Sequence, residues 1–154
     1  MYKITPAAYI FTHTYLNTMQ QGIQSLHVVG EFIAKYGPQI VDNNIVIQDE
    51  FADVQNWATH QKVVRILNAG GSPDFINHMD DAFKLARDNK MAFASFQEPD
   101  CFDQITAFGF IVPPDVVYEI QCEREAMGYL DKGDALKVDD FPLVKFLMQF
   151  QSAR

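Results

Sequence analysis

Short runs of β-branched and aromatic residues recur along the chain between polar segments, and each run predicts a buried strand. The four clearest runs cover residues 7–14, 62–67, 91–96 and 105–112. A further segment, "IVDNNIVIQDEF", alternates between apolar and polar residues around an Asn-Asn turn signal. This segment is compatible with a small hairpin or with an irregular excursion from the sheet.

Apolar residues at helical spacing predict four helices between and after these strands. The helices are expected to begin at residue 17 or 18, at 72, at 113 and at 141, and to end near residues 36, 89, 128 and 150. The second helix has the clearest start. There, Ser72 can cap the helix with its hydroxyl, Pro73 occupies a position whose N–H is not needed, and Asp74 is favoured by the helix dipole.

The first helix carries a polar ridge between two apolar strips. At about 100° per residue, one narrow stripe contains Gln20, Gln24, His27 and Glu31. The strip on one side of the ridge contains Met19, Ile23, Leu26 and Ile33, and the strip on the other side contains Val28 and Phe32. We expect one strip to pack on the sheet and the other on a second helix or subunit, so that the ridge lines a cleft. An exposed polar face is also what any surface helix presents.

The order of the elements predicts an α/β protein, because strands interleaved with helices form a mixed, largely buried sheet with helices on its faces. The expected architecture is a single-domain, three-layer α/β/α sandwich with a four-stranded mixed sheet. A length of 154 residues suits one domain, and no internal repeat is found. Residues 1–140 are expected to form the α/β domain. Residues 141–154 would form an apolar C-terminal helix that packs on the domain or on a partner.

The composition, with 48% hydrophobic residues, excludes disorder, whereas the net charge of −8 limits the choice of partners. Proteins that bind nucleic acid usually carry a basic surface, because counterion release from phosphate supplies much of their affinity. The only concentration of bases here comprises Lys62, Arg65, Lys84, Arg87 and Lys90. A function on RNA would have to use a small local patch, and the acidity otherwise favours solubility.

Sequence motifs for nucleotide, zinc-protease or serine-hydrolase sites are absent. The four histidines lack metal-ligand spacing, so no zinc site is expected. Cys101 and Cys122 lack a CxxC spacing and are expected to be free thiols in a reducing cytoplasm. No apolar run approaches the roughly 18 to 20 residues that cross a bilayer, and "MYKITPAAYIF" is a poor secretory signal. We therefore expect a cytoplasmic protein without membrane segments.

Three short motifs occur in order over residues 8–120: "QSLH" on the first helix, Trp57 followed by "KVVRIL", and "TAFGFIVPP". Together they resemble the second class of peptidyl-tRNA hydrolases, the archaeal and eukaryotic type. The segments "QQGIQSLH", "EPD" and "TAFGF" are most similar to those of divergent relatives from phages and bacteria. The resemblance implies a hydrolase that cleaves the ester between a peptidyl group and tRNA without metal or organic cofactor. It also implies a homodimer.

The resemblance further implies which residues form the site. The helix glutamine corresponds to Gln24, the histidine three residues later to His27, the acid that ends the third strand to Glu98 or less well Asp100, and the threonine that begins the fourth strand to Thr106. In such a site Glu98 or Asp100 orients a water, Thr106 and Gln24 donate hydrogen bonds, and His27 shuttles a proton. The expected substrate-binding residues are Gln20, Gln21 and Glu31.

Two departures from the family keep other functions open. The family lysine one turn before the glutamine is Gln20 here, and an Asp-x-Gly-x-Thr turn is replaced by "EPDCFDQ". A lysine supplies charge for a phosphate or an oxyanion, whereas glutamine supplies only a neutral amide. Three hypotheses follow: a metal-independent carboxylic-ester hydrolase, an inactive relative that binds RNA or a nucleotide, and an interaction protein that presents an apolar surface through its last helix.

Overall fold

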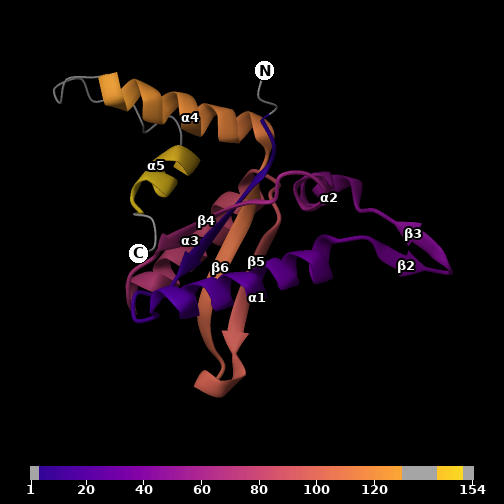
Figure 1. The fold of residues 1–154 in the computed structure, drawn as a ribbon, viewed down its shortest axis with the longest axis horizontal. Helices are drawn as coiled ribbons and strands as arrows, with labels where there is room; N and C mark the ends of the chain where they lie inside the picture. The colour runs from indigo at the N-terminus through magenta and orange to yellow at the C-terminus, as the bar shows by residue number, and fades with distance from the viewer. Residues whose placement is uncertain (1–3, 130–141, 151–154) are drawn as a thin grey trace.

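The computed structural model describes residues 4–129 and 142–150 of the 154-residue chain, and a four-stranded mixed sheet lies at its centre (Figure 1). The sheet contains β1 (Ala7–Thr12), β4 (Val63–Asn68), β5 (Phe93–Glu98) and β6 (Gln104–Val112), in the order β4-β1-β6-β5. β1 pairs parallel with β4 and antiparallel with β6, and β5 pairs antiparallel with β6. The four predicted strands and the mixed sheet are confirmed, with bounds that shift by one or two residues.

The helices alternate with these strands along the chain, as predicted. They are α1 (Thr18–Tyr36), α2 (Ala52–Thr59), α3 (Asp74–Asp88), α4 (Pro114–Tyr129) and α5 (Pro142–Met148). Two single turns of 3₁₀ helix, η1 (Asp49–Phe51) and η2 (Pro99–Cys101), precede α2 and follow β5. Helix α2 was not predicted, because its eight residues are too few and too polar to show a clear apolar period. Phe141, expected to begin the last helix, lies outside the described residues.

Helices cover both faces of the sheet, and the alternation of side chains along β1 shows how. Tyr9 and Phe11 point into a core with α3, α4 and α5, whereas Ala8 and Ile10 point into a second core with α1 and α2. The helices and the sheet therefore form three layers. Helix α5 packs on the first core through Leu143, Val144, Phe146 and Leu147. Of the two contacts expected for this helix, the structure shows the one with the chain's own domain.

Gly109 is required where β6 passes β1 in the middle of the sheet. It lies opposite Ile10, and a Cβ added at Gly109 would lie 2.5 Å from the carbonyl oxygen of Tyr9. Because the obstacle is backbone, no change of rotamer could relieve the contact. This glycine belongs to the "TAFGF" motif, so close packing against the Tyr9 backbone explains why glycine occupies this position of the motif.

The starts of α1 and α3 differ from each other in their capping. Asn17 caps α1 in a capping box with Gln20, so the start expected at residue 17 or 18 is confirmed. Helix α3 has no side-chain cap, and its N-cap position is Pro73. The prediction that Ser72 caps α3 is wrong. The Ser72 hydroxyl instead lies 3.3 Å from Nε2 of His13, at the end of β1.

The segment after α1 forms a hairpin of β2 (Gln39–Val41) and β3 (Asn44–Val46). Its turn consists of Asp42 and Asn43, both with positive φ, which is the backbone that a two-residue hairpin turn favours. Of the two structures compatible with the pattern, the hairpin is therefore the one that forms. Figure 1 shows it projecting away from the sheet beyond the C-terminal end of α1.

Candidate functional site

Helix α1 places its polar ridge along the β5 edge of the sheet. Val28 and Phe32 are fully buried against the sheet, so one of the two apolar strips packs as expected. The other strip, Met19, Ile23, Leu26 and Ile33, is exposed, and no described helix covers it. Between the strips, the ridge faces the end of β5 and the start of β6.

Gln24 joins two strands through both ends of its amide. Its Nε2 donates a hydrogen bond to Oε2 of Glu98 at 2.6 Å, and its Oε1 accepts one from the hydroxyl of Thr106 at 2.5 Å. Gln24 and Thr106 are buried, whereas Glu98 is half-buried. Glu98 and Thr106 lie 74 and 82 residues after Gln24 in the sequence, yet the three side chains meet in one hydrogen-bonded chain.

A β-bulge explains why Thr106 reaches α1. The register of β5 and β6 passes from Phe96 opposite Ala107 to Gln97 opposite Ile105, which leaves Thr106 as the extra residue. Ala107 already lies in the core beneath α1. Because the bulge interrupts the alternation, its neighbour Thr106 also points to α1 and not to the opposite face of the sheet.

The donors and acceptors in this chain are matched. An ionised carboxylate only accepts hydrogen bonds, so the NH₂ group of Gln24 must face Glu98 and its carbonyl must face the Thr106 hydroxyl. Among the described residues, no other group hydrogen-bonds Glu98. The second carboxylate oxygen is therefore available to orient a water or a substrate group, while Gln24 holds the carboxylate in place.

Tyr15, which the sequence analysis did not single out, is 52% exposed near the site, and its ring packs on that of His13. Burial, with further contributions from Cys101 and Glu98, raises the pKa of the Tyr15 hydroxyl. The phenol therefore stays protonated at neutral pH. Its position directly after β1, at the end of the sheet where Thr106 lies, was the available signal.

His27 reaches the same edge but not the hydrogen-bonded chain. It is exposed, and its ring stacks on that of Phe96 with centroids 4.1 Å apart and planes 9° apart. Phe96 lies two residues before Glu98 on β5. The stacking fixes the ring beside the site, but no hydrogen bond is described between His27 and Gln24, Glu98 or Thr106. Its role as a proton shuttle stays a prediction.

The remaining predicted residues lie around the chain without joining it. Gln20 is exposed, and its side chain accepts a hydrogen bond from the Asn17 backbone in the capping box. Gln21 is buried and donates to the carbonyl of Leu16, while its Oε1 has no described partner. Glu31 and Asp100 are exposed, the latter in η2 just beyond Glu98.

A second polar cluster stands at the end of β1, and it is not a nucleophilic pair. Nδ1 of His13 accepts a hydrogen bond from the backbone N–H of Tyr15 at 3.4 Å. In the neutral ring Nε2 then carries the proton and donates to the Ser72 hydroxyl, so His13 cannot also take a proton from Ser72. Burial lowers the pKa of His13, which favours this neutral form. The cluster joins β1 to the start of α3.

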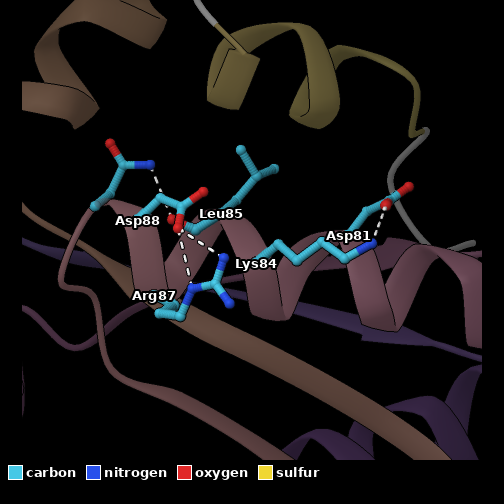
Figure 2. A network of polar contacts seen from close by, with 6 residues as sticks. Asp81, Lys84, Leu85, Arg87 and Asp88 are labelled. Carbon is cyan, nitrogen blue, oxygen red and sulfur yellow. Dashed lines mark hydrogen bonds and ion pairs between the residues drawn. The ribbon is translucent and has the colours of Figure 1, made fainter.

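Two of the five bases singled out in the sequence, Lys84 and Arg87, lie on α3. Lys84 is 3.8 Å from Asp81 and Arg87 is 3.0 Å from Asp88, and Figure 2 shows both pairs. Helix α3 covers the face of the sheet opposite to α1. These two bases are therefore paired with acids, on the side of the sheet opposite to Gln24.

The described part of the chain holds no group of three or more His, Cys, Asp or Glu side chains placed to bind a metal ion. Cys101 and Cys122 are both exposed and free. None of the described helices combines the length and the apolar character needed to span a membrane.

No protein-family model matches the chain, and the search of curated proteins found no significant match. The structure itself defines a mixed α/β protein with a four-stranded sheet and a partly buried amide–carboxylate–hydroxyl chain at one edge.

Proposed function

We propose that the protein is a metal-independent ester hydrolase of the peptidyl-tRNA hydrolase type, which cleaves the bond between an acyl or peptidyl group and tRNA. The observation that supports the proposal best is the convergence of Gln24, Glu98 and Thr106. These three positions correspond to the family's site in the resemblance, and nothing in their sequence spacing requires them to meet. The proposed protein acts in the cytoplasm of a phage-infected or bacterial cell, as a homodimer.

In the proposed reaction Glu98 acts as general base. Its free oxygen accepts a proton from a water that attacks the ester carbonyl, and Gln24 keeps the carboxylate aligned during the transfer. The protonated Tyr15 hydroxyl is a hydrogen-bond donor for the tetrahedral oxyanion. His27, stacked on Phe96 beside Glu98, then carries this proton from Glu98 to the leaving ribose oxygen, so that both side chains return to their starting protonation states.

The test is cleavage of purified peptidyl-tRNA by the full chain. Glu98→Gln and Gln24→Ala are expected to lower the rate by about 10²-fold or more, as for loss of a general base or its support. Glu119→Gln, an exposed acid on α4, is the matched control and should keep the wild-type rate. Asp100→Asn decides between the two candidate carboxylates.

Unchanged cleavage in both Glu98→Gln and Gln24→Ala would reject these roles. A rate that collapses in Asp100→Asn but not in Glu98→Gln would assign the base to η2 instead. A wild-type protein that releases no peptide from peptidyl-tRNA would reject the hydrolase itself.

A second function, binding of RNA without turnover, is favoured by one observation. The Gln20 side chain stands where the family has lysine, and it is used in the capping box of α1. No described contact joins a Lys or Arg to Gln24, Glu98 or Thr106. Without a cation at the site, the oxyanion would be stabilised only by neutral donors. This function predicts a tRNA complex that weakens steeply between 50 and 200 mM salt and shows no cleavage.

A further inference from the structure

We propose that the outer edge of β4 and the cavity beside it bind an extended acidic segment of another protein, which adds to the four-stranded sheet as a further strand. The segment places a carboxylate beside Arg65 and an apolar side chain in the cavity. The Gln24 chain lies at the opposite edge of the sheet, at the end of β5. The inference therefore stands or falls independently of the ester chemistry.

The outer side of β4 carries backbone groups that the sheet does not use. Strand β4 lies at the edge of the sheet and pairs only with β1. Directly after the strand, the N–H of Ala69 donates to the carbonyl of Thr12. Because the backbone groups of every second residue point to the same side of a strand, Val64 and Ile66 point away from β1. No described backbone bond joins their N–H and C=O groups to a segment outside the sheet.

The other edge of the sheet shows how this chain blocks a free strand. On β5, the Tyr36 hydroxyl accepts a hydrogen bond from the N–H of Phe93 at 3.2 Å and donates one to its carbonyl at 2.8 Å. Lys35 donates to the same carbonyl at 3.4 Å. Among the described residues, no side chain makes such contacts with the backbone of Val64 or Ile66. An edge strand with unpaired backbone groups is a template for pairing with another chain.

A cavity of about 310 Å³ opens beside the first half of β4, between that strand, the start of β1 and α4. Ile4, Val63 and Val117 give it an apolar lining, and Arg65 is the only charged side chain among the described residues that line it. Val63 and Arg65 are two residues apart and point to the same face of the sheet. A strand added beside β4 would therefore set one side chain next to each of them. An apolar residue two positions from Asp or Glu fits this pair.

The charge at this edge favours an acidic partner. Lys62 and Arg65 are exposed, and neither forms an ion pair with a described residue. Lys84 and Arg87 on α3, in contrast, pair with neighbouring acids. An arginine that is free of other partners can bind a carboxylate through two parallel hydrogen bonds. In a chain of net charge −8, these two bases select an acidic segment over a basic one at this place.

NMR of the full ¹⁵N-labelled chain tests the inference with the peptide Thr-Val-Thr-Glu-Thr-Val-Thr. The two valines and the glutamate lie on one face of the extended peptide, and the sequence reads the same in both directions, so no strand direction is assumed. The peptide is expected to shift the amide signals of Val64 and Ile66. The same peptide with Lys in place of Glu should bind at least about tenfold more weakly, because the charged hydrogen bonds are lost. A Glu peptide N-methylated at its three central residues keeps its charge but should not bind, because it cannot donate to the strand.

Substitutions in the chain separate the charge from the strand pairing. Arg65→Glu should reverse the preference, so that the Lys peptide binds and the Glu peptide does not. Val64→Pro removes an outward N–H that β1 does not use, which an edge strand tolerates, and should abolish binding of the Glu peptide. Arg87→Glu, on α3, is the matched control and should keep the wild-type affinity. Circular dichroism confirms that each variant is folded.

Three results would overturn the inference. The first is that the Glu peptide leaves the Val64 and Ile66 signals unchanged, or that the Glu and Lys peptides bind equally well. The second is that these signals shift with protein concentration in the absence of peptide, which would assign the edge to a second copy of the chain. The third is that a single-stranded uridine heptanucleotide shifts the same signals more strongly than the Glu peptide, which would assign Lys62 and Arg65 to phosphate.

Discussion

Gln24 shows how one neutral side chain can organise a site. Its amide satisfies the buried Thr106 hydroxyl with one end and the half-buried Glu98 carboxylate with the other. Neither partner has another described hydrogen bond from its side chain. Removal of the amide would therefore leave two polar groups without partners, and an unsatisfied buried group costs more than an average hydrogen bond contributes.

At this scale we expect Gln24→Leu to lower the free energy of unfolding by about 2 kcal/mol, because Thr106 and Glu98 lose their partner together. Urea denaturation measures the change. Gln121→Leu, at an exposed position on α4, provides the control and should leave stability within about 0.5 kcal/mol of wild type. Equal midpoints for wild type and Gln24→Leu would show that the amide contributes nothing to the fold.

Helix α1 serves two surfaces at the scale of the element. One side packs on the sheet and carries Gln24 to the strand ends, and the opposite side presents the exposed apolar strip of Met19, Ile23, Leu26 and Ile33. The capping box at its start and Gly37 at its end define its length. The length and start of this helix therefore determine where Gln24 meets the strand ends.

The prediction for this element is that Asn17→Ala destabilises the protein by about 1 kcal/mol, since the side chain that caps the backbone N–H of Gln20 is lost. The unfolding midpoint in urea reports the effect. Asn77→Ala, an exposed asparagine inside α3, is the comparison and is expected to be neutral or slightly stabilising. If both substitutions had the same effect, the cap of α1 would carry no measurable free energy.

At the scale of the whole molecule, the sheet separates the Gln24 chain from the acid–base pairs of α3. The Gln24 chain and the exposed apolar strip of α1 lie on one side of the sheet. The acid–base pairs of α3 lie on the other side (Figures 1 and 2). His13 links these layers at the end of β1. Its ring contacts Ser72 and Phe75 near the start of α3, and its backbone N–H donates to the carbonyl of Thr106 on β6.

His13 should therefore make the stability of the molecule depend on pH. Burial lowers its pKa in the folded protein below the ordinary value of 6.5. As the pH falls below 6.5, the unfolded chain takes up a proton that the folded protein resists, so the free energy of unfolding decreases. Between pH 7.5 and 5.5 the wild type should lose more stability than His13→Gln in urea titrations. Parallel losses in both proteins would contradict a buried neutral His13.

Parts of the fold and site were accessible from the residue pattern for definite reasons. The strands carry Tyr9, Phe11, Phe108 and Phe110 inside the sheet, and such aromatic runs are easily recognised. The residue pattern predicted that the third strand ends at Phe96, whereas the resemblance placed an acid, Glu98 or less well Asp100, at its end; β5 ends at Glu98. Helix α2 and the partner of Ser72 were missed, because a short polar helix has little periodicity and a hydroxyl beside a proline is equally suited to a cap or a distant contact.

Local patterns established the order of strands and helices, the cap at Asn17 and the hairpin, because each depends on residues a few positions apart. The mixed pairing of the sheet, the bulge that turns Thr106 toward α1 and the burial of α5 on its own domain depend on contacts between distant segments. Those contacts depend on how the sheet and the two helical layers pack against each other. The meeting of Gln24, Glu98 and Thr106, and the exposure of one strip of α1 while the other is buried, are consequences of that packing.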